Sequence, residues 1–219
     1  MVDCSRHYTG LAHMHGTRTE NEGGAHRESG LSNDDRDVLA LVEHDDWRAA
    51  LRILAQRYGS AVRRYCREAL QDAALADDVA QQVFVCAYRD LPLFGGRSTI
   101  RTWLFAIARH RVLDAEKARQ RAHAHLEDIE LSESIDVPDP SPSPSESIDD
   151  CRLQSALVDS ISALPEQART AILLRFERGF TFEEMAEICR EQPATLQARV
   201  ARALPVLRAA LRARFNDSF

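Results

Sequence analysis

The sequence lacks a long apolar run. None of its 219 residues belongs to a stretch of about 18 consecutive apolar residues, so we expect no transmembrane helix. The first residues also lack the basic-then-apolar layout of a secretory signal peptide. Both absences argue against membrane insertion and export, and we expect a cytoplasmic protein. Its composition, 44% hydrophobic and 28% charged, is ordinary for one or two small globular domains.

The cysteines show no pairing pattern. Five are scattered along the chain, an odd number without a C-x-x-C spacing: Cys4, Cys66, Cys86, Cys151 and Cys189. This distribution predicts free thiols in a reducing compartment. Cys4 lies in a histidine-rich N-terminal segment, where a metal sensor is the alternative to a plain extension, although the spacing matches no common zinc pattern. We expect no metal site and no cofactor.

The motifs of an enzyme are also missing. The sequence contains no nucleophile and base at a recognised spacing, no metal-binding cluster and no phosphate-binding glycine loop. Runs in which apolar and polar residues alternate, the pattern of β-strands, are absent as well. We therefore expect an all-α protein that is not a catalyst and has no small-molecule substrate.

Helical periodicity is present in two parts of the chain, separated by an acidic segment. Residues 126–150 contain nine carboxylates, no Lys or Arg and several Pro–Ser pairs, so they bury too little apolar surface to offset the entropy of ordering. The sequence thus predicts two small helical domains joined by a flexible acidic linker. The expected boundaries are a disordered tail at 1–32, a first domain at 33–125, the linker at 126–150 and a second domain at 151–215.

The second domain contains the spacing of a helix-turn-helix. A short helix, FEEMAEIC, is followed by a turn and by PATLQARVARAL, and Thr181 with Glu184 forms a capping-box pattern at the start. On a helical wheel the expected core face consists of Leu196, Val200, Ala203, Leu204 and Leu207, and the open face of Thr195, Ala198, Arg199 and Arg202. An open basic face suits duplex DNA. The alternative is a helical hairpin with a solvated basic face. We expect this helix to end or kink near Leu204, because Pro205 removes a backbone hydrogen bond.

The first domain contains two further motifs. In ADDVAQQVF the polar side chains form a stripe that suits docking on a basic or polar protein surface, and its members are Asp77, Asp78, Gln81 and Gln82. The alternative is a plain solvated face. The following segment, GGRSTIRTWLFAIARHRVLD, combines a glycine loop, an aromatic residue and several arginines. That combination fits single-stranded DNA, whose bases stack while its backbone meets guanidinium groups. For Trp103 alone, packing in the core is the alternative.

Together these motifs resemble the second and fourth conserved regions of bacterial sigma factors of the extracytoplasmic-function group, over about residues 35–121 and 152–212. The resemblance implies that the polar stripe binds the clamp helices of the RNA polymerase β′ subunit. It implies that the loop 91–98 and the helix after it contact the −10 element, with the candidates Arg97, Ser98, Arg101, Trp103, Arg109 and Arg111. It also implies that the −35 element is read by Thr195, Gln197, Ala198, Arg199 and Arg202.

The partners implied by this resemblance are RNA polymerase core, including its β′ and β subunits, promoter DNA and an anti-sigma factor that is often membrane-anchored. In the family the linker runs through the polymerase cleft, where nine carboxylates could mimic RNA; a solubilising spacer is the alternative. Departures from the family pattern are His110 in place of a common asparagine, Ala198 in place of a common serine, and Pro205. Two other functions stay open: a helix-turn-helix regulator that acts without polymerase, and a sigma-like adaptor.

Overall fold

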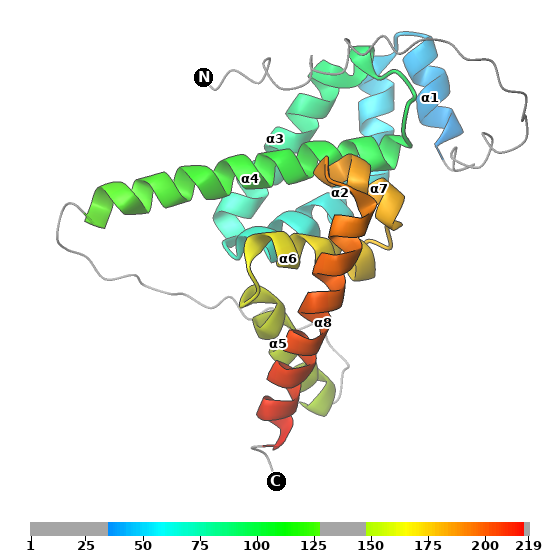
Figure 1. Cartoon of the computed structure of the whole chain (residues 1–219). Coiled ribbons are helices and arrows are strands. Elements are labelled where there is room, and N and C mark those ends of the chain that lie inside the picture. Colours follow the sequence, from blue (N-terminus) through cyan, green and yellow to red (C-terminus); the bar gives the residue numbers. More distant parts are fainter. Residues whose placement is uncertain (1–34, 128–147, 217–219) are drawn as a thin grey trace, which may run out of the picture.

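The computed structural model describes residues 35–127 and 148–216, and every element in these two ranges is helical (Figure 1). The first range contains α1 Arg36–Glu43, α2 Trp47–Leu70, α3 Ala73–Asp90, the 3-10 turn η2 Leu91–Leu93 and α4 Ile100–Glu127. The second contains α5 Ile148–Ser162, α6 Glu166–Ile172, the π-helical turn η3 Leu173–Glu177, α7 Phe182–Cys189 and α8 Pro193–Asn216. The predicted all-α fold is confirmed. The predicted tail and most of the predicted linker lie outside the described residues.

Short side chains fix where the helices of the first half begin. The Asp46 carboxylate accepts the Ala49 N–H at 3.1 Å at the start of α2, and Asp72 accepts the Leu75 N–H at 2.9 Å at the start of α3. Each satisfies a backbone donor that has no partner within its helix. The apolar faces then pack together, and the apolar residues that recur at helical spacing along α4 are buried: Ile100, Trp103, Leu104, Ile107 and Ala108.

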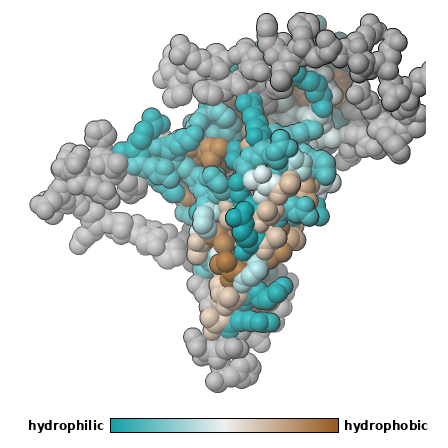
Figure 2. Space-filling model, in the orientation of Figure 1, coloured by the Kyte–Doolittle hydropathy of each residue, from teal (hydrophilic) through white to brown (hydrophobic). Residues whose placement is uncertain are grey.

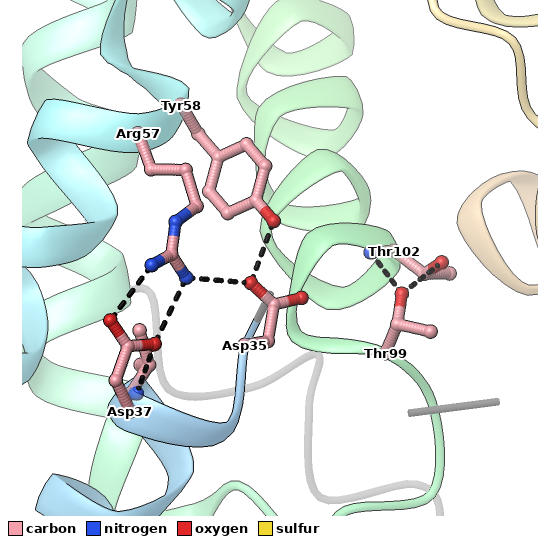
Figure 3. Close-up of polar contacts among 7 residues, drawn as sticks. Asp35, Asp37, Arg57, Tyr58, Thr99 and Thr102 are labelled. Carbon is pink, nitrogen blue, oxygen red and sulfur yellow. Dashed lines mark hydrogen bonds and ion pairs between the residues drawn. The ribbon is translucent and has the colours of Figure 1, made fainter. Parts of the chain in front are cut away.

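An ion-pair cluster attaches α1 to α2 (Figure 3). Arg57 donates to Asp35 at 3.1 Å and to Asp37 at 2.8 Å, and the Tyr58 hydroxyl donates to Asp35 at 2.7 Å. Asp35 is only 2% exposed, so these donors replace the water that its carboxylate has lost. Burial, together with the hydrogen bond to Asp35, raises the pKa of Tyr58, which therefore stays a donor at neutral pH.

The second half contains the predicted helix-turn-helix geometry. The capping box at Thr181 is confirmed, with the Glu184 N–H donating to the Thr181 hydroxyl at 3.2 Å and the Thr181 N–H donating to the Glu184 carboxylate at 2.8 Å. Helix α7 ends at Arg190 in the left-handed conformation, φ 55°, and α8 begins three residues later. The chain therefore turns sharply between two helices whose inner faces share one core.

One expected core position of α8 was wrong, and so was the expectation that the helix could end near Leu204. Leu204 is 38% exposed, whereas the other expected core positions are buried, because it lies about 80° around the helix from Leu196 at 3.6 residues per turn. The helix also runs unbroken through Pro205. Buried Ala203 and Leu207 hold the turns on both sides, and the Ala201 carbonyl deprived of its N–H partner lies on the exposed face, where water can hydrate it.

The two halves pack against each other. Helix α7 lies beside the N-terminal part of α4 (Figure 1), and the Phe105 and Phe180 rings meet edge to face with centroids 5.1 Å apart. Polar contacts also join the two halves: Arg169 donates to the Ala69 carbonyl at 2.6 Å, and Arg64 lies 2.7 Å from the Glu177 carboxylate. Within the described ranges, no helix is long and apolar enough to cross a membrane.

We predict that Arg57→Ala destabilises the first half. The substitution removes one of the two side-chain donors to the buried Asp35 carboxylate, and leaving such a group underpaired costs about 1–3 kcal/mol. Urea denaturation followed by circular dichroism measures the change in the free energy of unfolding. Arg52→Ala, at an exposed arginine of the same helix, is the control and should change stability little. Equal stability of the two variants would contradict a supporting role for this cluster.

Candidate nucleic-acid and polymerase interfaces

The four residues of the predicted polar stripe on α3 do not all face solvent. Asp78, Gln81 and Gln82 are exposed. Asp77 is instead turned toward α2, where Arg67 lies 3.2 Å and Arg63 lies 3.6 Å from its carboxylate oxygens. The three exposed residues are thus available to a partner, while Asp77 also contributes to the packing of α3 on α2.

Two exposed apolar residues extend this stripe, and the sequence reasoning missed them. Val85 is 69% exposed and Tyr88 is 40% exposed. Val85 follows Asp78, Gln81 and Gln82 at helical spacing, so all four share one side of α3. Extending the helical wheel by one turn would have found it. A polar row that continues into exposed apolar side chains is typical of a protein-binding surface. We call Asp78, Gln81, Gln82, Val85 and Tyr88 the α3 surface.

The loop before α4 contains a mixture of exposed and buried candidates. Arg97 is exposed and Ser98 is half-buried. The chain bends at Gly96 with φ 64°, a conformation that favours glycine, and Thr99 then caps α4 by accepting the Thr102 N–H at 3.0 Å (Figure 3). This geometry leaves the Arg97 side chain at the surface and fixes the start of the helix behind it.

Trp103 lies in the core. It is 6% exposed and packs edge to face against Phe94, with ring centroids 5.3 Å apart. The contact fits the alternative weighed from the sequence, in which this residue packs inside the protein. Because Phe94 belongs to the loop, Trp103 anchors the loop on α4 and does not offer its ring to solvent.

Two arginines of α4 that were predicted to contact DNA face the second half. Arg101 donates to the Arg178 carbonyl, and its guanidinium lies 4.0 Å from the centroid of the Phe180 ring. Arg109 is 13% exposed at its side chain and lies 3.7 Å from the Glu191 carboxylate. Arg111 is held separately by Asp114 at 2.8 Å. The structure therefore brings Arg101 and Arg109 to one interface and does not bring Arg111 to it.

On α8, four of the five predicted −35 residues are exposed and one is paired within the protein. Thr195, Gln197, Ala198 and Arg202 are exposed. Arg199 is 16% exposed at its side chain and makes a bidentate pair with Glu191, with N–O distances of 3.0 and 2.6 Å. This pair lowers the pKa of Glu191 and raises the pKa of Arg199, so both groups stay charged. Arg199 thus joins α8 to the turn that precedes it.

An exposed apolar surface lies at the end of the molecule formed by α5 and α8, where Figure 2 shows apolar side chains. Its exposed members are Leu153, Leu157, Val158, Leu204 and Val206. Leu153 and Leu157 lie one turn apart on the same side of α5, and exposed apolar side chains that gather in this way mark sites for protein partners. We call these five residues the α5–α8 surface.

None of the described residues forms a cluster of three or more His, Cys, Asp and Glu side chains that could hold a metal ion. The histidines of the N-terminal segment and Cys4 lie outside these residues. Three described cysteines are buried free thiols: Cys66, Cys86 and Cys189. Burial raises the pKa of Cys66 to about 12 and that of Cys189 to about 11, so both stay protonated and weakly reactive.

A carboxylate pair lies between the two halves. Glu68 of α2 faces Glu177, and Arg178, which is 3% exposed at its side chain, lies 3.1 Å from Glu68 and 2.6 Å from Glu177. Burial and the neighbouring Glu177 carboxylate raise the pKa of Glu68 to about 8, while Arg178 opposes the shift. A proton between the two carboxylates relieves their repulsion, so the contact favours the protonated Glu68.

Residues 54–122 match the sigma-70 region 2 family, and residues 154–204 match the sigma-70 region 4 family. The chain is 30% identical over 181 residues to the RNA polymerase sigma-H factor of Pseudomonas aeruginosa, covering 81% of this chain and 93% of that protein. It is 30% identical over 173 residues to the ECF RNA polymerase sigma-E factor of Haemophilus influenzae, covering 77% of this chain and 90% of that protein.

Solved structures have a similar fold. The sigma factor RpoE of Bartonella quintana, solved in complex with the anti-sigma factor NepR, matches with a TM-score of 0.60 and 22% identity over 81% of this chain and 96% of that one. CnrH, solved in complex with the cytosolic domain of CnrY, matches with a TM-score of 0.59 and 23% identity over 83% of this chain and 99% of that one.

We predict that the contact around Glu68 weakens as pH rises. The folded protein holds a proton on Glu68 up to about pH 8, whereas the ordinary value is 4.5, so the folded state binds more protons between these values. Its contribution to stability is complete below about pH 4.5 and is lost as pH rises through about 8. Denaturation at pH 6 and pH 9 should show a larger loss of stability in the wild type than in Glu68→Gln, whose amide does not titrate. The same loss in both would contradict the assignment.

Proposed function

The chain belongs to the extracytoplasmic-function (ECF) group of the sigma-70 family, and we propose that it performs the task of this family, directing RNA polymerase to promoters, through three separate surfaces. These are the α3 surface for polymerase core, the start of α4 with its preceding loop for the −10 element, and the exposed side of α8 for the −35 element. The observation that carries the proposal is the α7–α8 pair with Thr195, Ala198 and Arg202 open on one side. A regulator that uses only this pair would leave the first half without a role.

The α3 surface suits a protein partner better than DNA. It contains one carboxylate, two amides and two exposed apolar side chains, and it contains no cation. Carboxylates repel phosphate, whereas a mixed polar and apolar surface binds a helical protein partner. We assign this surface to the clamp helices of the polymerase β′ subunit, with Val85 as an apolar contact at its centre.

The two DNA surfaces have different chemistry. Arg97, Ser98 and the arginines at the start of α4 would meet a single strand, where guanidinium groups bind phosphate and flipped bases enter a pocket. Thr195, Gln197 and Arg202 would meet the major groove, where side chains read base edges. Ala198 contributes only a methyl group to this face, so it can contact DNA through an apolar surface and not through a charge.

Protein partners of the second half would use the α5–α8 surface. Its leucine and valine side chains are exposed, and their burial against a partner is favourable at about 25 cal/mol per Å² of apolar area. We assign to this surface the polymerase β subunit in the active complex and an anti-sigma factor, free or membrane-anchored, in the inactive one. In this function the chain acts in the cytoplasm and selects the promoter, and the polymerase catalyses RNA synthesis.

We predict that Asp78→Arg and Val85→Asp each weaken binding to core polymerase by at least about tenfold, equivalent to about 1.4 kcal/mol. The first reverses a charge on the α3 surface and the second places a charge on its apolar centre. Binding is measured by fluorescence anisotropy, and function by run-off transcription with core polymerase on a library of promoter fragments. Gln56→Arg, at an exposed position of α2, is the matched control. Normal holoenzyme assembly by both variants would remove the α3 surface from the docking site, and a wild type that yields no transcript despite binding core would overturn the function.

We predict different effects for the two arginines of α8. Arg202→Ala should weaken transcription that depends on the −35 element by about 1–3 kcal/mol and leave stability unchanged, because a bidentate base contact has that magnitude. Arg199→Ala should lower the melting temperature as well, since it removes the pair with Glu191. Promoter variants in a transcription assay, together with thermal denaturation, separate the two effects. Arg208→Ala, further along α8, is the control. An unchanged promoter response in Arg202→Ala would remove that residue from the reading face.

A further inference from the structure

We propose that Gln192 reads an adenine at one end of the −35 element, as a base contact in addition to those of Thr195 and Arg202. The inference rests on the assignment of the exposed side of α8 to duplex DNA. Gln192 is the residue directly before α8, and its side chain is exposed. It lies three residues before Thr195 and seven before Arg199, so it continues the reading side of the helix toward the N-terminus.

The main chain holds Gln192 in a fixed position between α7 and α8. The Glu191 N–H donates to the Ala186 carbonyl of α7 at 3.2 Å. The Gln192 carbonyl accepts the Thr195 N–H at 3.0 Å and the Leu196 N–H at 3.3 Å, and Leu196 is completely buried. These hydrogen bonds use main-chain atoms only. The origin of the Gln192 side chain is therefore fixed, while its amide group is left to contact a base.

The sequence puts this amide ahead of the first turn of α8. A proline disfavours the helical conformation in the residue before it, and Pro193 follows Gln192 directly. Pro193 begins the helix, at the position where its missing N–H costs no hydrogen bond. The sequence of the first turn, PATL, contains no acidic residue that would repel phosphate. In a helix-turn-helix the side chains at the N-terminal end of the second helix contact base edges, and Gln192 lies at this end.

The neighbouring guanidinium group is engaged within the protein. Both terminal nitrogens of Arg199 donate to the Glu191 carboxylate, at 3.0 and 2.6 Å. An arginine reads guanine with its guanidinium nitrogens, whereas the amide of a glutamine pairs with N6 and N7 of adenine. While the pair between Arg199 and Glu191 holds, this part of the surface offers a base an amide in place of a guanidinium. Its chemistry predicts adenine in preference to guanine opposite the start of α8.

The length of the helix separates this contact from that of Arg202. The two residues are ten positions apart in the sequence, which corresponds to about 15 Å at about 1.5 Å per residue. Successive bases of a strand are about 3.4 Å apart, so the two side chains face bases up to about four pairs from each other. Gln192 therefore contacts one end of the recognised sequence, and its replacement leaves the base preferences at the other end unchanged.

Gln192→Ala and Gln192→Glu test the contact in the holoenzyme of the full chain with core polymerase. The holoenzyme transcribes a promoter library whose −35 element is randomised, and a barcode in each transcript identifies its promoter. The wild type should prefer adenine at one end of the element by at least about fivefold, and Gln192→Ala should lose this preference alone. Gln192→Glu should favour cytosine at the same position, because a carboxylate accepts a hydrogen bond from the N4 amino group of cytosine. Gln167→Ala, at an exposed glutamine of α6, is the matched control and should keep the wild-type profile.

A second measurement changes the DNA in place of the protein. At the position of the preferred adenine, 7-deazaadenine lacks the N7 acceptor and keeps the Watson–Crick edge. This base should weaken transcription by the wild type and have no effect on Gln192→Ala, because only the wild type has an amide to lose a hydrogen bond. The melting temperature should be the same in the wild type and both variants, since the hydrogen bonds at this turn are made by the main chain.

The outcomes that contradict the inference differ from one another. If both variants weaken transcription equally from all sequences, Gln192 contacts phosphate, and the base contact is overturned. If both variants keep the wild-type base profile, the inference is overturned while the −35 surface of α8 stands. A wild type without a base preference at any position of the element overturns the assignment of α8 to the −35 element, and the inference with it.

Discussion

The guanidinium group is the physical feature on which the association of the two halves depends. Arg64, Arg101, Arg109, Arg169 and Arg178 all make contacts across the interface, to carboxylates or to backbone carbonyls. A guanidinium has five donors in a fixed plane and does not lose its charge, so its burial requires acceptors from more than one direction. In this chain the second half supplies acceptors for the first half, and the first half supplies acceptors for the second.

This constraint connects the fold to the function. A protein that binds phosphate needs arginines that are partly free of other partners, whereas a stable interface needs arginines that are fully paired. Arg109 and Arg178 are neither free nor fully paired, because the Nε atom of each is buried without a hydrogen-bond partner. Each guanidinium group is paired through another of its nitrogens, so it stabilises the interface while one of its donors has no partner.

Much of the helical framework could be predicted from the sequence because it depends on local signals. Thr181 and Glu184 predict the start of α7, and the helical periodicity of the two parts of the chain predicts the all-α fold; each signal depends on residues within one or two turns. The family resemblance was equally accessible, because it depends on the order and spacing of motifs. The division of the chain into domains remains a prediction, since the two halves share a common buried core.

The remaining features depend on contacts between residues far apart in the sequence. Arg101 meets Arg178, and Glu191 meets Arg109, across separations that no helical wheel includes. Leu204 was misjudged because the wheel treats a helix as isolated, whereas the partner surface decides how wide the buried stripe becomes. The effect of Pro205 was misjudged because it depends on whether the flanking turns are held by buried residues and whether the unpaired carbonyl reaches water. The Arg199 pair with Glu191 spans a turn whose left-handed residue, Arg190, carries no glycine or asparagine signal.

These long-range contacts leave the two surfaces that we propose for DNA with different exposure. On α8, Thr195 and Arg202 are exposed. On α4, Arg101 and Arg109 are paired with the second half, through the Arg178 carbonyl and the Glu191 carboxylate. A side chain that is already paired contributes to a new contact only in exchange for the old one. On this proposal the −35 surface can meet duplex DNA directly, whereas contact of Arg101 and Arg109 with the −10 element costs the free energy of their contacts to the second half.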